Sequence, residues 1–191
     1  MGAQVIVGTT TQPRFSREWA MPCKDTFTVP PIRRFVLRYL AKSKISIDPF
    51  ARNSQLCTYS NDLNPNTSAK SHLEAREFLS QLVERGVTAD LIVFDPPYSL
   101  EQLKRSYESI GRKYTMEDGW LPRNWRTEKT LCNQLLGSHG VFLNFGWGTS
   151  GMGLKRGFEI VEIMLVCHGG GHNDTICMAE RRSTTRLLEA A

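Results

Sequence analysis

The sequence predicts an α/β protein built on an open sheet, and three observations support this class. Short apolar runs of strand length alternate with longer segments in which apolar residues recur at helical spacing. The run Leu91–Phe94 ends directly on Asp95-Pro96-Pro97-Tyr98, and open α/β sheets bind their ligands at such strand ends. With 191 residues the chain is long enough for one sizeable core, so we expect a single domain over residues 1–191.

The expected elements follow one another as strands and helices along the chain. Residues 1–27 contain little periodicity and are expected to form an extended or irregular N-terminal arm, after which Pro30-Pro31 opens a helix. Strands are expected at residues 44–48, 56–60, 90–95, 141–145, 158–166 and 175–180, with a short further strand that ends near Glu74. Helices are expected from Ala75 up to Gly86 and at residues 99–110 and 124–136. Residues 181–191 are expected to be a frayed tail.

The net charge of +5 and the pI near 9.1 favour an acidic partner, of which nucleic acid is the commonest. Segment 99–139 is the candidate target-recognition insert, although its small excess of basic residues is also typical of a solvated surface. Aromatic residues lie between the basic ones and favour contact with bases and phosphates. The candidate nucleic-acid contacts in this segment are Lys104, Arg105, Arg112, Lys113, Trp120, Arg123, Trp125 and Arg126.

Composition disfavours several other classes of protein. No apolar run reaches membrane-spanning length and no charged-then-apolar signal opens the chain, so we expect a cytoplasmic protein without membrane contact. The five cysteines include no C-x-x-C pair, and reduced thiols are therefore expected. His168 and His172 lie in a glycine-rich loop beside Cys167, but no fourth ligand is evident and we expect no metal. We expect this loop to lie near the nucleic acid or over the target base.

The motif Asp95-Pro96-Pro97-Tyr98 combines a carboxylate, rigid backbone carbonyls and a flat ring within one turn. Proline has a fixed φ and no N–H, so the carbonyls there are available as acceptors. Asp95 and the Pro96 carbonyl could both accept hydrogen bonds from one exocyclic amino group, while Tyr98 could stack on the ring that carries it. The alternative is a strand followed by an ordinary proline-rich turn. The order and spacing of the surrounding motifs favour a site that modifies an amino group.

With these residues the chain resembles the D-P-P-Y family of amino-group DNA methyltransferases, of the adenine-N6 type and similar to small phage-encoded members. The resemblance extends from about Thr28 to Glu180. It includes segments 45–54, 61–65 and 74–79, which are similar to the family's three cofactor motifs. The resemblance implies a Rossmann-like fold with a seven-stranded, mostly parallel sheet whose last strand is antiparallel. It also implies S-adenosylmethionine as the cofactor.

The resemblance further implies a role for each motif residue. The implied cofactor contacts are Thr28 for the amino-acid carboxylate, Asp48, Pro49, Phe50, Ala51 and Asn53 in the loop under the methionine portion, Asp62 and Leu63 near the ribose, and Glu74 and Ala75 near the adenine. The implied catalytic residues are Asp95, Pro96, Pro97 and Tyr98, and His168 and His172 are candidate nucleic-acid contacts. Many members have glycines where this chain has Arg52-Asn53-Ser54, and asparagine tolerates left-handed geometry better than most residues. Glu74 stands where aspartate is usual.

The motif alone does not identify the polymer that carries the amino group. The resemblance favours N6 methylation of a flipped adenine in double-stranded DNA. One alternative is methylation of RNA adenine or of cytosine N4. Another is a catalytically silent relative that only binds nucleic acid. Segment 99–139 is too short for a large recognition domain, so we expect a short target site, or specificity supplied by a second copy or a partner subunit.

Overall fold

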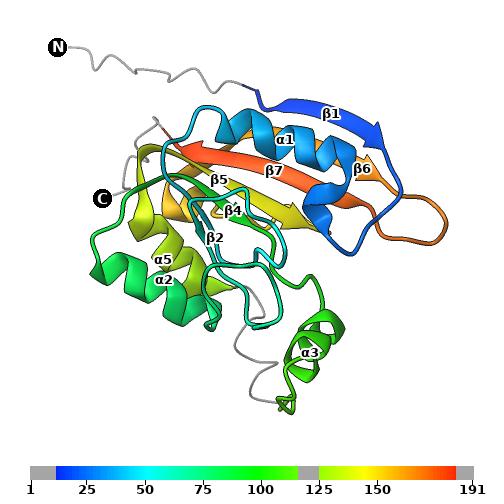
Figure 1. Cartoon of the computed structure of the whole chain (residues 1–191). Helices are drawn as coiled ribbons and strands as arrows, with labels where there is room; N and C mark the ends of the chain where they lie inside the picture. Colours follow the sequence, from blue (N-terminus) through cyan, green and yellow to red (C-terminus); the bar gives the residue numbers. More distant parts are fainter. Residues whose placement is uncertain (1–11, 116–124, 184–191) are drawn as a thin grey trace.

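Seven strands form one sheet in the order β1-β6-β7-β5-β4-β2-β3 in a computed structural model, which describes residues 12–115 and 125–183 (Figure 1). The strands are β1 (Arg14–Trp19), β2 (Ser46–Asp48), β3 (Tyr59–Ser60), β4 (Ala89–Phe94), β5 (Leu136–Gly146), β6 (Phe158–Cys167) and β7 (Thr175–Arg182). The last strand, β7, is antiparallel to both β5 and β6, and the other strand pairs are parallel. The predicted Rossmann-like α/β fold with an antiparallel last strand is therefore confirmed.

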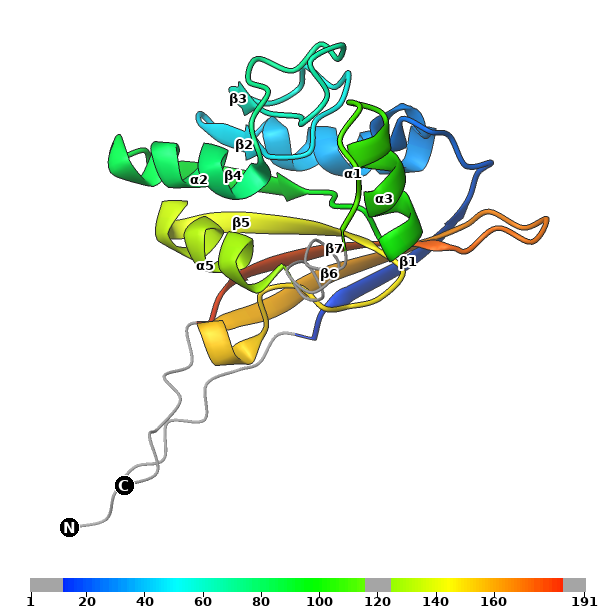
Figure 2. The same cartoon turned by 90° about the horizontal axis from the view of Figure 1, so that it is seen from below.

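Helices cover both faces of the sheet, and one helix stands apart from it. Helix α1 (Pro30–Leu40) lies on one face, whereas α2 (Ala75–Glu84) and α5 (Arg126–Leu135) lie on the other (Figure 1). Helix α3 (Leu100–Glu108) follows the carboxyl end of β4 and projects beyond the sheet (Figure 1), so that it overlaps α1 in the view from below (Figure 2). Within the described ranges, no helix is long and apolar enough to cross a membrane.

The interior strand β4 is apolar from Leu91 to Phe94 because both of its faces are covered there. Leu91 and Val93 pack in the core beneath α1, while Ile92 and Phe94 pack in the core beneath α2 and α5. All four side chains are almost completely buried. A strand covered on both sides shows a continuous hydrophobic run rather than alternation, which is the pattern the sequence contains here.

The sheet has the predicted number of strands, but one predicted strand is absent and one strand that was not predicted is present. The short strand expected near Glu74 is absent from the described segment 61–74, where only an isolated bridge joins Asn61 to Ser71. The prediction of an irregular arm is wrong for Arg14–Trp19, which form β1 and pair in parallel with β6. The prediction of a frayed tail is wrong at its start, because Arg181 and Arg182 belong to β7. Residues 1–11 and 184–191 lie outside the described residues.

A buried carboxylate explains why β1 joins the sheet. Glu162 of β6 is 3% exposed and accepts hydrogen bonds from Arg14 of β1 at 2.8 Å, from Arg38 at 2.6 Å and from the Tyr39 hydroxyl at 2.6 Å. Burial raises the pKa of Glu162, but these three donors outweigh it and hold the pKa below its usual value. The arm, α1 and β6 are therefore joined through one charged group.

Candidate active site

A cleft of about 880 Å³ opens where β2, β3, β4 and β5 end. Its lining includes residues that directly follow each of these strands: Pro49 and Phe50, Asn61 and Asp62, Asp95 to Tyr98, and Trp147. The N-terminal segment contributes Lys24 and Thr26 to the same lining. The strand connections thus bring together segments that are far apart in the sequence, at the edge where α/β sheets bind ligands.

Asp95 is positioned at the inner end of this cleft by β4. Its Oδ1 accepts a hydrogen bond from the Tyr98 hydroxyl. Burial raises the pKa of Asp95, while hydrogen bonds from Tyr98 and Thr26 and the charge of Arg52 act in the opposite direction. The carboxyl is therefore oriented by its own motif and by the N-terminal segment, and it retains lone pairs that can accept from a ligand.

Tyr98 and Trp147 form an aromatic corner beside Asp95. Their ring centroids are 5.7 Å apart and the rings are inclined by 69°. The Tyr98 backbone N–H donates to Gln102 Oε1 at 2.6 Å, which fixes the turn that leads into α3. Trp147 is 45% exposed and lines the cleft, so it is not a core tryptophan. A planar ring could stack in such a corner.

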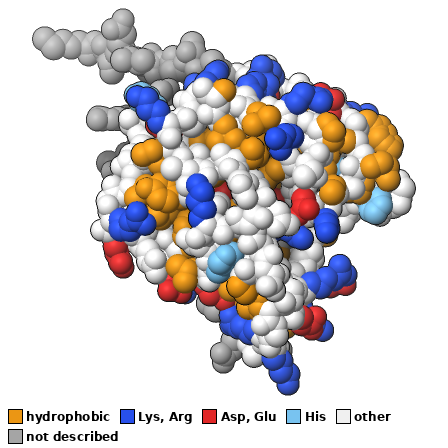
Figure 3. All heavy atoms as spheres, in the orientation of Figure 1, with side chains coloured by type: hydrophobic (Ala, Val, Ile, Leu, Met, Phe, Trp, Pro, Cys, Tyr) orange, Lys and Arg blue, Asp and Glu red, His pale blue; other side chains and the backbone are white. Residues whose placement is uncertain are grey.

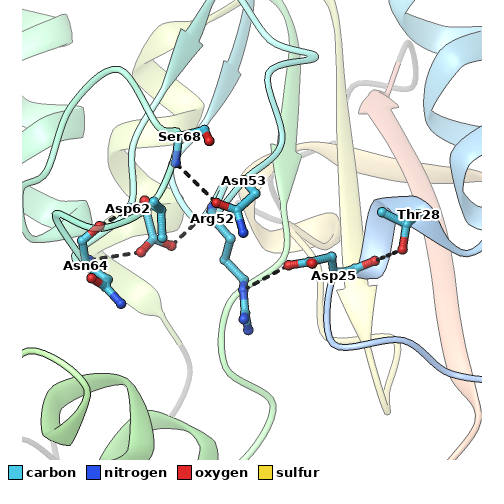
Figure 4. Close-up of polar contacts among 8 residues, drawn as sticks. Asp25, Thr28, Arg52, Asn53, Asp62, Asn64 and Ser68 are labelled. Carbon is cyan, nitrogen blue, oxygen red and sulfur yellow. Dashed lines mark hydrogen bonds and ion pairs between the residues drawn. The ribbon is translucent and has the colours of Figure 1, made fainter.

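The loops after β2 and β3 are connected through Asp62 (Figure 4). Asp62 Oδ2 accepts from the Arg52 N–H at 3.1 Å, and Oδ1 accepts from the Asn64 N–H at 2.9 Å. Each carboxylate oxygen can accept a further hydrogen bond, so Asp62 can still bind a ligand hydroxyl in the cleft. Arg52 in turn pairs with Asp25 at 3.5 Å, which ties the N-terminal segment to the same loop.

Two buried polar residues support these loops from behind. Asp48 is 1% exposed, and its Oδ1 accepts from the Phe50 N–H at 3.0 Å while Oδ2 has no partner in the described chain. Burial, with the charges of Asp95 and Asp62, raises the pKa of Asp48. The Asn61 side chain donates to the Pro49 carbonyl at 3.2 Å and to the Leu73 carbonyl at 2.9 Å. Asp48 and Asn61 therefore fix the loop shape.

In the loop after β2, the residue with left-handed backbone geometry is not the one that the sequence led us to expect. Arg52, rather than Asn53, has the left-handed backbone, with a φ of 49°. Asn53 instead accepts a hydrogen bond from the Ser68 N–H at 3.2 Å (Figure 4). A non-glycine residue in this region costs conformational energy, and the hydrogen bond from Arg52 N–H to Asp62 offsets it.

Glu74 is held at the start of α2 by an ion pair with Arg112, which follows α3. The Arg112 guanidinium also lies over the Tyr107 ring, 4.2 Å from its centroid. Arg112 was expected to contact nucleic acid, yet its partner Glu74 is a predicted cofactor residue, and both line the cleft. The pair joins the segment after α3 to the side of the cleft formed by α2.

Not every predicted cofactor residue reaches the cleft. Pro49, Phe50, Asp62, Leu63, Glu74 and Ala75 line it, whereas Thr28, Asp48, Ala51 and Asn53 do not. The exposed Thr28 donates its hydroxyl to the Asp25 carbonyl at 2.7 Å, and Thr26 is the threonine that faces the cleft. Sequence reasoning also missed Lys24 and Gln102 in the lining, and it did not assign a ligand contact to Arg52 although Arg52 lies in the cofactor-like segment 45–54.

The predicted nucleic-acid residues occupy varied environments. Lys104 and Arg105 pair with Glu108 and Glu101 on the exposed side of α3. Trp125 packs against Phe50, with centroids 5.0 Å apart, and also lines the cleft. The exposed residues Lys113 and Arg126 do not line the cleft, and Trp120 and Arg123 lie outside the described residues. On the face seen in Figure 3, Lys and Arg side chains are spread among hydrophobic and acidic ones.

His168, a candidate nucleic-acid contact, belongs to the lining of the cleft, but its ring nitrogens are engaged within the fold. His168 is 3% exposed, and its ring nitrogens are hydrogen-bonded to the Ala20 carbonyl at 2.7 Å and to the Thr175 hydroxyl at 2.8 Å. It therefore fixes the end of β1 to the start of β7. His172 is exposed and lies at the cleft lining. Across residues 12–115 and 125–183, no group of three or more His, Cys, Asp or Glu side chains is arranged to bind a metal.

Comparisons with known proteins concern the fold alone. No family model and no curated protein matches this chain. Among solved structures, the chain is similar to SMU.776, a candidate methyltransferase complexed with SAH, at 8% identity and a TM-score of 0.49 over 78% of this chain and 48% of that one. The chain thus spans about half the length of SMU.776. It is also similar to yhhF from Escherichia coli, a candidate methyltransferase, at 12% identity and a TM-score of 0.47 over 86% and 92% of the two chains.

Proposed function

We propose that this chain is an S-adenosylmethionine-dependent methyltransferase that modifies the N6 amino group of adenine in DNA. One observation carries the proposal. The Asp95–Tyr98 motif opens into the same cleft as Asp62 and Glu74, so an amine-binding motif and two ligand-binding acids face one space. The fold alone would not support this choice, because α/β sheets serve many unrelated functions.

The residues of the cleft suit each part of the cofactor. Asp62 retains acceptor capacity for the ribose hydroxyls, and Glu74 can accept from the adenine amino group. Lys24 and Arg52 supply positive charge for the amino-acid carboxylate, in place of Thr28. Bound there, S-adenosylmethionine supplies an electrophilic methyl group. The cleft volume of about 880 Å³ lies within the range of cofactor sites.

The motif at the end of β4 would position the target amine. The remaining lone pairs of Asp95 and the carbonyl of Pro96 accept the two amino hydrogens, which orients the nitrogen lone pair away from the ring plane. Because the Tyr98 and Trp147 rings are inclined by 69°, Tyr98 can stack on the face of the target ring while Trp147 contacts its edge. The amine becomes acidic when it gains the methyl group, and Asp95 then accepts the released proton through the hydrogen bond that already joins them.

Double-stranded DNA is the proposed polymer, and a target base inside a duplex must be flipped out to reach Asp95. The net charge of +5 favours a polyanion. The exposed basic residues Lys113 and Arg126 are candidates for phosphate contacts. Whether a second copy or a partner subunit contributes to target choice stays a prediction.

The experiment supplies methyl-labelled S-adenosylmethionine with duplex DNA, single-stranded DNA or RNA, and then identifies the labelled nucleoside. The proposal expects N6-methyladenine in DNA, and Asp95→Asn should abolish labelling while cofactor binding persists. Label in RNA or at cytosine N4 would replace the proposed substrate. Cofactor binding without label in any polymer, under conditions that allow turnover, would favour the silent relative.

A further inference from the structure

A second cavity of about 380 Å³ adjoins the cleft on the side of α5. The two spaces share Pro96, Pro97 and Tyr98 of the motif, together with Trp125 and Trp147. The motif therefore lies where the large cleft meets a smaller, aromatic-lined cavity, with Asp95 on the side of the cleft. A volume of this size accommodates a small planar ligand.

Asn144 is a buried polar residue that faces this cavity without a partner. It lies near the carboxyl end of β5, is 4% exposed, and lines the cavity. Its side chain forms no hydrogen bond with any residue in the described ranges. Its amide is not among the fully buried side-chain atoms that lack a partner in the described residues, so it keeps access to the cavity that it lines. The Asn144 amide is therefore available to a ligand there.

Lys129 is a second polar residue in the same wall. It is 5% exposed, and its Nζ donates to the Ser150 carbonyl at 2.5 Å. The Nζ lies 6.0 Å from the centroid of Phe94, and Phe94 pairs with Asn144 in adjacent strands. No carboxylate of the described residues lies within ion-pair distance of this Nζ. Two further N–H groups of the ammonium remain for a ligand.

Burial, strengthened by the charge of Arg156, lowers the pKa of Lys129, while the charges of Glu180 and Glu128 act in the opposite direction. Helix α5 therefore places a largely buried amino group in the wall of the cavity.

We propose that this second cavity binds the ring that carries the target amine, and that Asn144 and Lys129 select rings with hydrogen-bond acceptors on their edge. The inference rests on the proposed function and names the residues that determine its substrate. An ammonium can only donate, so Lys129 requires a ring nitrogen or a carbonyl oxygen. Asn144 both donates and accepts, so it can read a ring nitrogen or an adjacent N–H. Adenine carries such ring nitrogens beside its amino group.

The test measures the dissociation constant of 2′-deoxyadenosine by ligand-observed NMR, with and without SAH. The same titration uses the analogues that lack N7 or N1 of the ring, and the variants Asn144→Leu and Lys129→Met. Matched controls are Asn66→Ala and Lys42→Met, which change exposed residues outside both cavities. SAH binding and the midpoint of thermal unfolding are measured for every variant.

The inference expects 2′-deoxyadenosine to bind roughly 10–100-fold more weakly to Asn144→Leu and to Lys129→Met, as for a lost hydrogen bond with a charged or desolvated group. At least one of the two analogues should bind the unmodified protein more weakly than 2′-deoxyadenosine does, to a similar extent. In the variant that lacks the side chain contacting the missing ring nitrogen, this analogue and 2′-deoxyadenosine should bind equally. SAH binding should be unchanged. Asn144→Leu should unfold at a temperature no lower than that of the unmodified protein, because the Asn144 side chain has no hydrogen bond within the described residues for the change to break. An asparagine with a purely structural role would instead lower the unfolding temperature when replaced.

Equal binding of 2′-deoxyadenosine to the unmodified protein and both variants would overturn the inference. So would SAH binding without any binding of the nucleoside. If SAH does not bind but the nucleoside does, and its affinity depends on Asn144 and Lys129, then the proposed function fails and the second cavity remains a ring-binding site.

Discussion

The hydrogen bond from the Tyr98 hydroxyl to Asp95 can be removed without removing the Tyr98 ring, by the change Tyr98→Phe. Burial raises the pKa of Asp95, and the bond from Tyr98 is the largest effect that lowers it. Without that donor, the pKa of Asp95 should rise further above its usual value. Asp95 must be ionised to accept both an amino hydrogen and the proton released later. The acid limb of the rate profile should therefore move to higher pH.

A hydrogen bond to a charged group contributes about 1.5–3 kcal/mol, and Tyr98→Phe leaves no buried donor unsatisfied because it removes the donor itself. We therefore expect the free energy of unfolding to fall by about that amount at neutral pH, measured by urea titration with an unchanged slope. The second measurement is kcat/KM for methyl transfer as a function of pH.

Tyr59→Phe is the matched control, since Tyr59 lies on β3, its ring is near Arg85, and no hydrogen bond joins it to Asp95. This control should leave both measurements unchanged. An unfolding free energy and an acid limb that are the same in Tyr98→Phe and the unmodified protein would refute the assigned role of the hydrogen bond.

Three further predictions concern stability and polymer binding. The low pKa of Glu162 stabilises the fold above the unfolded-state pKa, and this stabilisation is lost as the pH falls through the lower folded-state pKa, so Glu162→Gln should flatten the acid part of the stability profile. Gly151→Ala should cost about 1–3 kcal/mol in chemical unfolding, because the added Cβ would lie 1.8 Å from Glu180 Oε2. Lys113→Ala and Arg126→Ala should each reduce the slope of log binding constant for DNA against log salt concentration by about one where the residue contacts phosphate. If the slope is unchanged in both variants, the DNA-binding surface lies elsewhere.

The sequence predicts well those elements in which the pattern of apolar residues matches the pattern of buried side chains. The β4 run is apolar at each position because helices cover both faces, and α1 shows Ile32, Phe35 and Val36 at helical spacing because one side of it faces the sheet. The prolines at the start of α1 also mark its first turn. In these segments the local pattern and the tertiary environment agree.

Strand β1 could not be predicted in this way. It lies at the sheet edge and most of its side chains are exposed, so no apolar pattern marks it. Its partner Glu162 is 148 residues away from Arg14, and no local spacing records such a contact. The strand expected to end near Glu74 was predicted but does not form. In its place, the Asn61 side chain joins the polar loops by hydrogen bonds, and only an isolated bridge to Ser71 is present.

The sequence predicted those site residues that lie just after strands, and it missed those whose position depends on a distant side-chain partner. Asp95 comes directly after β4 and Asp62 lies two residues after β3, and the order of the strands in the sheet brings both into one cleft. The pairing of Arg112 with Glu74 spans 38 residues and left no signal in the sequence. His168 was expected at the ligand because of its glycine-rich loop, but Ala20 and Thr175 occupy both ring nitrogens. Asn144 is a polar residue within an apolar strand, and that interruption was the one available clue.

The most direct test of the central claim is calorimetric titration of the unmodified protein with S-adenosylmethionine. The account predicts saturable binding with one site per chain. It also predicts that Asp62→Ala weakens this binding by about 1.5–3 kcal/mol, the range for hydrogen bonds to a charged group, whereas Asp95→Asn leaves it largely unchanged. A titration without saturable heat, in protein shown to be folded, would contradict the claim that this cleft is a cofactor site.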